Sequence, residues 1–151
     1  MTHQGVEIPP RRMPEDDRGY LEELTKAVFR AGFSWQVIHD KWPAFLDAFD
    51  GFDIQRVAAY GEPHIDRLLS DARIVRNGRK IEATVFNAQV MSELIDEHGS
   101  LHDYLRSLDG LSYAERRKVL SQRFRNVGPT TVFVFLYSVN EEVPSWDERN
   151  A

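Results

Sequence analysis

Apolar residues recur every three or four positions along most of this chain, a spacing that predicts amphipathic helices. The first helix is expected from Tyr20 to Ala31, with Gly32 ending it. Ser34 is a suitable N-cap for a second helix, within which Pro43 predicts a kink or a break one or two residues earlier. Two helices joined by a short turn are therefore expected near the start of the chain.

The middle of the chain predicts several more helices, separated by capping and helix-breaking residues. These residues are Asp53, Gly61, Pro63, Gly99, Ser100, and the pair Ser112 and Glu115, which forms a capping box. Residues 74–80, which include Asn77 and Gly78, are expected to form a turn between helices, although Asn-Gly also suits a β-hairpin. A long buried helix is predicted directly after this turn.

The last apolar stretch, residues 132–139, is ambiguous by composition. Its β-branched and aromatic residues favour a strand, whereas Pro129 at a first-turn position favours a buried helix. Because helices are predicted elsewhere, a single strand would have no partner for its backbone groups. We therefore predict a helix here and an all-α fold, with a flexible N-terminal arm over residues 1–17 and one helical domain over residues 18–151.

Composition narrows the class of protein. Of the 151 residues, 42% are hydrophobic and 28% are charged, which is typical of a soluble domain. No apolar run approaches the roughly 20 residues that span a bilayer, and the N-terminal segment lacks the apolar core of a signal peptide. The absence of cysteine excludes disulfides and thiolate metal sites, and it fits a cytoplasmic protein. The histidines show no ligand spacing, so we predict neither a metal site nor a cofactor.

The net charge of −5 conceals an uneven distribution of charge along the chain. Negative residues crowd both ends, and positive residues collect in the middle and later parts. The positive residues are Arg73, Arg76, Arg79 and Lys80, followed by Arg116, Arg117, Lys118, Arg123 and Arg125. Because salt screens charges beyond about 8 Å, such local clusters decide whether a protein can hold phosphates. An acidic average therefore does not exclude nucleic acid as a partner.

Three segments make the chain resemble a known family. They are residues 24–35 (LTKAVFRAGFSW), residues 71–81 (DARIVRNGRKI) and residues 123–130 (RFRNVGPT). In order and approximate spacing they resemble segments of the bacterial 3-methyladenine DNA glycosylase I family, which belongs to the helix-hairpin-helix superfamily. The resemblance covers roughly residues 20–140. It implies a helix-hairpin-helix DNA glycosylase-like fold.

The chain departs from that family at three places. The family has a Glu that contacts the flipped base, and the equivalent position here is Ala27. The family also has a structural zinc site built from two Cys and two His, whereas this chain has no Cys. An N-terminal aromatic segment that lines the family's base pocket is missing as well. Of that pocket, Trp35 is the main residue that remains.

The hairpin Val127-Gly128-Pro129-Thr130 has a physical role that its residues explain. Gly128 lets the backbone approach a phosphate closely, Pro129 presets the entry into the next helix, and the free amides at that helix start face the anion. Such contacts hold DNA without reading its sequence. The expected backbone contacts are Arg123, Arg125, Val127, Gly128, Thr130 and Thr131. An ordinary packing corner between two helices is the alternative.

The base itself is expected to contact Trp35 and the position of Ala27, as the resemblance implies. An extruded base is held between aromatic walls, so Trp35 can stack on it. A core tryptophan at a helix start is the alternative interpretation for Trp35. Trp42 and Trp146 are interpreted as packing residues.

A carboxylate usually stabilises the positive charge that builds on the sugar when a glycosidic bond breaks. Many relatives in the wider superfamily place a catalytic Asp after the hairpin glycine at a distance close to that of Asp147, which makes Asp147 the candidate catalytic residue. The other interpretation of Asp147 is a frayed chain end. Two further acidic pairs are expected to be solvated: Glu22 and Glu23 on the outer face of a helix, and Glu141 and Glu142.

Together these features lead us to expect a monomeric, cytoplasmic DNA glycosylase without a cofactor. The resemblance implies that it excises alkylated purines, 3-methyladenine above all, from double-stranded DNA in base excision repair after base flipping. A catalytically inactive DNA-binding or damage-recognition module with the same fold is the alternative, because Ala27 replaces the family's Glu. A helical protein that has put the fold to another use is the third interpretation.

Overall fold

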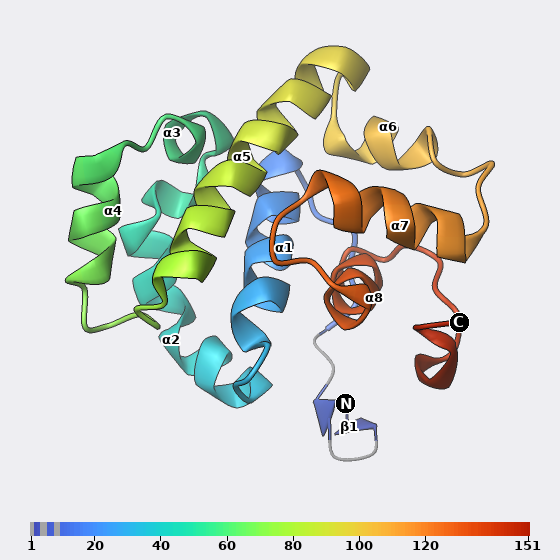
Figure 1. Ribbon diagram of the computed structural model, residues 1–151, viewed down its shortest axis with the longest axis horizontal. Coiled ribbons are helices and arrows are strands. Elements are labelled where there is room, and N and C mark those ends of the chain that lie inside the picture. Colours follow the sequence, from blue (N-terminus) through green and yellow to red (C-terminus); the bar gives the residue numbers. More distant parts are fainter. Residues whose placement is uncertain (1, 4–5, 8–9) are drawn as a thin grey trace.

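A long helix, α5 (Gly78–His98), crosses the middle of the structure, and other helices lie on both sides of it (Figure 1). The computed structural model describes residues 2–3, 6–7 and 10–151. On one side lie α2 (Trp35–Ala48), the 3-10 turn η1 (Asp50–Phe52), α3 (Ile54–Ala58) and α4 (Glu62–Leu69). On the other side lie α6 (Leu101–Arg106), α7 (Tyr113–Arg123) and α8 (Pro129–Ser138). Helix α1 (Asp17–Arg30) packs against α2, α5 and α8 and so joins the two groups.

The predicted all-α fold is confirmed. The strands in the described part of the chain are two short ones near the N-terminus, β1 (Thr2–His3) and β2 (Val6–Glu7), which pair antiparallel. The ambiguous residues 132–139 belong to α8, as predicted, except for the C-cap Val139. Within the described residues, no helix combines the length and the apolar character needed to cross a membrane. The division into an arm of residues 1–17 and one domain of residues 18–151 stays a prediction.

Most of the predicted helix starts are confirmed by their capping hydrogen bonds. The Ser34 hydroxyl accepts from the Val37 amide at 3.2 Å, and the Asp53 carboxylate accepts from the Arg56 amide at 3.0 Å. The Ser112 and Glu115 capping box is present in both directions. These caps satisfy amides that have no partner inside their own helix, which is why they are readable from sequence.

Two local predictions are corrected in part by the structure. Helix α2 runs through Pro43 without the predicted break, because the buried side chains of Ile38 and Phe45 anchor it in the core before and after the proline, and the alternative of a kink stays a prediction. The turn expected over residues 74–80 ends at Asn77, which caps the start of α5 and whose side chain accepts from the Lys80 amide at 3.2 Å. Asn is therefore used here as an N-cap and not as a hairpin residue.

Stacked aromatic rings fill the core between α2, η1 and α3. The Trp42 ring lies between Phe45 and Phe52, with centroids at 5.1 and 5.0 Å. Phe49 continues the stack from Phe52 at 5.3 Å. The prediction that Trp42 is a packing residue is confirmed, because its ring is buried within this stack. Its indole Nε1 donates to the Glu22 carboxylate at 2.7 Å, so α2 is fixed to α1 by a polar contact as well.

Glu141, just after α8, was predicted to be solvated. The structure instead buries it, because the chain folds back over it. Only 5% of the residue is exposed, and its carboxylate pairs with Arg106 at the end of α6. Its backbone carbonyl accepts from Arg11 at 2.6 Å. Glu141 thus links three segments that are far apart in the sequence. The exposed Glu142 beside it fits the prediction.

We expect Glu141→Ala to lower the free energy of unfolding by about 2 kcal/mol, since it breaks a half-buried ion pair and, among the described residues, leaves Arg106 paired with the more exposed Asp109. Urea unfolding followed by circular dichroism measures this change. Glu142→Ala is the matched control and should stay within about 0.5 kcal/mol of wild type. Equal effects of the two substitutions would contradict the structural role of the Arg106 pair.

Candidate functional site

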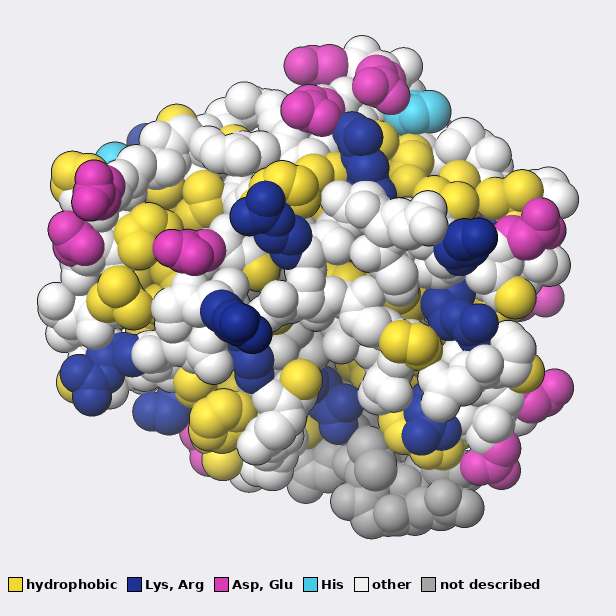
Figure 2. All heavy atoms as spheres, in the orientation of Figure 1, with side chains coloured by type: hydrophobic (Ala, Val, Ile, Leu, Met, Phe, Trp, Pro, Cys, Tyr) yellow, Lys and Arg dark blue, Asp and Glu magenta, His cyan; other side chains and the backbone are white. Residues whose placement is uncertain are grey.

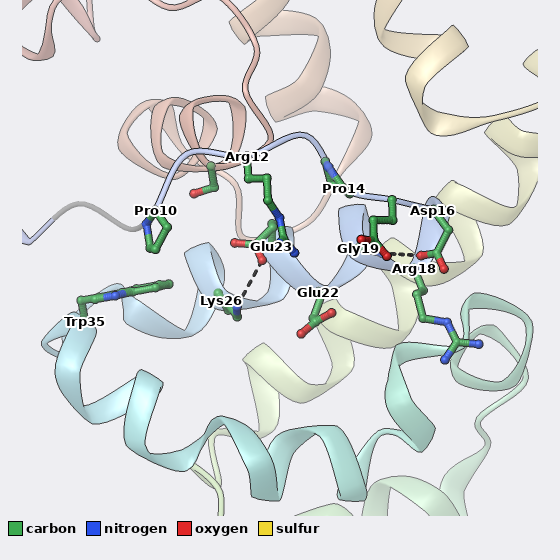
Figure 3. Close-up of a pocket in the computed structure, with 12 residues that line it drawn as sticks. Pro10, Arg12, Pro14, Asp16, Arg18, Gly19, Glu22, Glu23, Lys26 and Trp35 are labelled. Carbon is green, nitrogen blue, oxygen red and sulfur yellow. Dashed lines mark hydrogen bonds and ion pairs between the residues drawn. The ribbon is translucent and has the colours of Figure 1, made fainter. Parts of the chain in front are cut away.

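A cavity of about 440 Å³ lies between α1 and the segment that precedes it, with Trp35 at one end (Figure 3). Its size is within the range of small-molecule pockets. The side chains around it are mostly charged, and Trp35 is the aromatic residue among them. The lining residues are Pro10, Arg12, Pro14, Glu15, Asp16, Arg18, Gly19, Glu22, Glu23, Lys26, Trp35 and Ser138.

One wall of the cavity is a polar stripe along α1. Gly19, Glu22, Glu23 and Lys26 follow one another at helical spacing, so they share one side of the helix. The expectation that Glu22 and Glu23 lie on a solvated outer face is wrong, because the N-terminal segment covers that face. The polar stripe is therefore the wall of a cavity and not a free surface.

Glu23 is the most confined carboxylate of this wall. Its side chain is 21% exposed, and the Lys26 ammonium lies 3.1 Å from its Oε2 (Figure 3). Burial raises the pKa of Glu23, and the nearby Lys26 offsets this effect only in part. Lys26 also lies 5.0 Å from the centroid of the Trp42 ring and 5.9 Å from that of Trp35. A carboxylate and two indole rings thus surround one cation.

The opposite wall is the segment before α1, which is attached to α8. The Arg12 amide donates to the Ser138 carbonyl at 3.0 Å, and Arg11 donates to the Tyr137 carbonyl at 3.0 Å. Pro14 crosses α1 so closely that a Cβ built on Gly19 would lie 2.5 Å from the Pro14 Cβ. Glycine is therefore required at position 19 for this wall to approach α1.

The turn between α1 and α2 carries two aromatic residues, and Lys80 fixes its position. The Lys80 ammonium donates to the carbonyls of Phe29 and Ala31, at 3.2 and 2.5 Å, and so satisfies the end of α1. Gly32 then adopts a φ of 85°, which favours glycine. Trp35 is half-buried at the cavity, whereas Phe33 is 43% exposed.

The hairpin between α7 and α8 has its apolar residue inside and its glycine outside. Val127 is buried, whereas Gly128 and Thr130 are exposed and Thr131 is buried. Gly128 is the N-cap of α8, so the first amides of α8 have no partner within the helix. This arrangement is suited to an anion at the start of α8.

Asn87, a buried residue of α5, holds the hairpin in place. Its side chain donates to the Arg125 carbonyl at 3.2 Å and accepts from the Arg125 amide at 2.8 Å. Asn87 was not among the predicted site residues, because its role as a backbone clamp could not be inferred without the contact. Of the two predicted arginines, Arg125 is exposed and lies over the Phe86 ring, whereas Arg123 pairs with Glu93 at 2.9 Å.

The face formed by α5, α7 and the hairpin is positively charged at its centre. Figure 2 shows Lys and Arg side chains across the middle of this face and Asp and Glu mostly at its rim. A shallow groove beside Gly128 and Pro129 is lined by Arg117 and Lys118, among others. The uneven charge distribution along the sequence therefore becomes a local positive surface around the start of α8.

The predicted base contacts and the predicted catalytic residue are not all brought together. Trp35 lines the cavity, whereas Ala27 is 1% exposed and lies inside the core packing of α1. Asp147 is exposed in η2 (Trp146–Glu148) and is not part of the cavity wall. The roles of Trp35, Ala27 and Asp147, and those of the hairpin residues, stay predictions.

The zinc site that the resemblance implies does not fit this chain. Two of its ligands are cysteines, and the sequence contains none. Among the residues that the structure describes, no group of three or more His, Asp or Glu side chains is arranged to hold a metal ion. The helical domain is held together here by packing and by contacts such as the Arg106 and Glu141 pair.

Solved structures define the class of protein to which this fold and site belong. The 3-methyladenine DNA glycosylase I from Staphylococcus aureus superimposes with a TM-score of 0.77 and 26% identity, over 90% of this chain and 87% of that chain. A tyrosine-to-phenylalanine variant of 3-methyladenine DNA glycosylase I in complex with 3-methyladenine gives a TM-score of 0.75 and 28% identity, over 91% and 83%. The fold is thus that of a helix-hairpin-helix DNA glycosylase.

Sequence comparison identifies the family. The sequence model of the methyladenine glycosylases matches residues 12–122, and this chain belongs to that family. DNA-3-methyladenine glycosylase 1 of Escherichia coli (strain K12) is 32% identical over 83 residues, which are 54% of this chain and 44% of that protein. DNA-3-methyladenine glycosylase of Haemophilus influenzae is 28% identical over 74 residues, 49% of this chain and 40% of that protein. The matched segments thus span less than half of either relative.

We expect Glu23→Gln to become more stable relative to wild type as the pH rises from about 4 to about 7. Because the folded-state pKa of Glu23 is raised, the stabilising contribution of its protonated form is present below the ordinary pKa and is lost as the pH rises through the raised pKa. Glutamine copies the protonated form at every pH. Thermal melting across this range measures the difference.

The control for this experiment is Glu142→Gln, which changes an exposed glutamate just after α8. Its melting temperature should follow that of wild type at each pH. A Glu23→Gln protein that is clearly less stable than wild type at neutral pH would contradict the unfavourable burial of Glu23.

Proposed function

We propose that this protein is a DNA glycosylase that hydrolyses the N-glycosidic bond of alkylated purines, with 3-methyladenine as the first substrate to test. The observation that carries the proposal is the Trp35 cavity, found in the same domain as the exposed start of α8. The names of the similar proteins support the same substrate. The proposal includes double-stranded DNA with alkylated bases as the partner, a role in base excision repair, and a monomer in the cytoplasm.

The α8 start and the basic residues around it would hold the DNA backbone. The free amides after Gly128 and the exposed side chains of Lys118 and Arg125 are suited to phosphates and not to base edges. Val127 supports this hairpin from inside, and Thr130 and Thr131 supply the first amides of α8. Arg123 would contribute if it left its surface ion pair with Glu93, which is a weak interaction.

Two aromatic residues of the turn after α1 would take part in base flipping. Phe33 is exposed at the surface of this turn, so it can enter the stack at the place that the base leaves. Trp35 is at the cavity and can stack on the extruded base. Lys80 positions both residues, because it fixes the carbonyls at the end of α1.

Hydrolysis would break the bond between C1′ of the deoxyribose and the base nitrogen. The bonding electrons leave with the alkylated base, which loses its positive charge, and water supplies the hydroxyl group to C1′. In this proposal Asp147 remains the candidate to stabilise the charge on the sugar or to accept the proton of the water. Because Asp147 lies in the exposed turn η2, bound DNA would have to reach that turn.

The test of the function is release of base from methylated duplex DNA, measured by chromatography. Wild type should release 3-methyladenine, and Trp35→Ala should reduce the single-turnover rate by about tenfold or more, because a base–aromatic stack contributes about 1–3 kcal/mol. Val37→Ala, which removes an exposed side chain from the first turn of α2, is the control and should leave the rate unchanged. Binding to an abasic-site analogue without release would favour the inactive module, and no binding at low salt would overturn both.

Gly128→Ala tests how the DNA backbone is held. A Cβ at this position would meet no protein atom within 4 Å, and φ is −86°, so we expect an unchanged melting temperature. The methyl group would obstruct a phosphate at the start of α8, so DNA binding should weaken about tenfold, as for one or two lost hydrogen bonds. Fluorescence anisotropy with a labelled duplex measures the affinity. Unchanged affinity would mean that the start of α8 does not face the phosphate.

A further inference from the structure

The surroundings of the Lys26 ammonium form a site for a cation. The Glu23 carboxylate lies at 3.1 Å, and the rings of Trp42 and Trp35 have centroids at 5.0 and 5.9 Å. Indole rings and carboxylates are the groups that attract positive charge in proteins. This site opens on the Trp35 cavity, because Glu23, Lys26 and Trp35 all line it (Figure 3).

The pair of Glu23 and Lys26 does not hold the fold together. Both residues belong to α1 and are three positions apart, so their contact joins no two elements. Such a pair stabilises a helix by about 0.2–0.5 kcal/mol. Within the described part of the chain, Lys26 is the only hydrogen-bond partner of Glu23. A confined carboxylate that contributes so little to the structure is a candidate for function.

The other charges around the cavity do not replace the role of Glu23. Glu22 already accepts from Trp42, and Arg18 pairs with Asp53 at 3.7 Å. Asp16 caps α1, with its carboxylate accepting from the Gly19 amide at 3.3 Å. Arg12 and Glu15 lie in the exposed segment on the opposite wall. Glu23 is thus the carboxylate whose hydrogen bond is to a side chain of its own helix, so a ligand cation can take over this contact.

We propose that Glu23 contacts the extruded, positively charged base and that Lys26 occupies the place of that base until it enters. This inference rests on the proposed function, and it names the residue that recognises the substrate. The alkylated base would bring its positive charge between Glu23 and the Trp35 ring. The Lys26 side chain, which is 20% exposed, would then move its ammonium towards solvent.

This exchange gives the pocket a preference between classes of base. A cationic alkylated base replaces one positive charge by another, so Glu23 keeps a partner throughout. A neutral, undamaged base would displace the ammonium and leave the confined Glu23 with the exposed Arg12 of the opposite wall as its remaining counter-charge, which is unfavourable. Lys26 is therefore a specificity-determining residue, and Glu23 is the base-contacting one.

The test compares wild type, Glu23→Gln and Lys26→Met in single-turnover excision from methylated duplex DNA. Glu23→Gln should lower the rate for the cationic 3-methyladenine between about tenfold and about a hundredfold. The rate of wild type should fall in acid as Glu23 is protonated, beginning above the ordinary pKa of a glutamate, and Glu23→Gln should lack this decrease. Lys26→Met should lower the enzyme concentration that gives half of the maximal single-turnover rate for the cationic base, and it should reduce discrimination against undamaged purines.

Controls separate this inference from a folding defect and from the proposed function. Glu142→Gln and Lys41→Met change the same residue types outside the cavity and should match wild type. Melting curves should show Glu23→Gln to be at least as stable as wild type at neutral pH. If wild type excises 3-methyladenine and Glu23→Gln does so at the same rate, the inference is overturned and the function stands. If wild type neither binds nor excises, the function itself fails.

Asp147→Asn completes the comparison of the two carboxylates. A carboxylate that contacts the base affects the choice of substrate, whereas one that stabilises the sugar affects every substrate equally. We therefore expect Glu23→Gln to change the ratio between cationic and neutral purines, and Asp147→Asn to leave that ratio unchanged. A changed ratio in Asp147→Asn with an unchanged ratio in Glu23→Gln would overturn the role of Glu23.

Discussion

The packing of α1 between α2, α5 and α8 is the constraint on which the rest of the structure depends. It buries apolar residues around most of the helix, including Leu21, Leu24, Val28 and Phe29. Beyond its first turn, the charged residues of α1 are thereby confined to one stripe, which another segment of the chain covers. Because the segment before α1 crosses it without filling the space, a cavity remains where a surface would otherwise be. The candidate site is thus a consequence of how one helix is buried.

The position of Trp35 follows from the same helix. Lys80 of α5 satisfies the carbonyls at the end of α1, so the turn that leads into α2 begins at a fixed point. Ser34 then caps α2 and sets the direction in which Trp35 leaves the turn. On the other side, the contact between Pro14 and Gly19 fixes how close the opposite wall can come. Both ends of the cavity are therefore set by specific contacts of named side chains.

Local chemistry made much of the fold predictable, but it did not predict which polar residues are buried. Ser34, Asp53 and Ser112 cap helices because a short polar side chain before an apolar pattern has few other uses. The helix over residues 132–138 followed from the lack of any strand partner. Glu23 and Glu141 were misread because periodicity shows which side of a segment is polar, and not what lies over it. Both are covered by segments that are distant in sequence or lack apolar periodicity. No pattern in the chain predicts where those segments lie.

In the function proposed here, the absence of a Glu at the position of Ala27, where the resemblance implies one, leaves a carboxylate in the cavity beside Trp35. Glu23 lies one turn earlier on α1. Ala27 is 1% exposed in the core packing, whereas Glu23 lines the cavity together with Trp35. The carboxylate beside Trp35 in this chain therefore comes from position 23. What differs is the ammonium of Lys26, which only a carboxylate at position 23 holds at 3.1 Å in this helix. The divergence at position 27 would thus change how strictly the pocket selects charged bases, and it need not abolish their recognition.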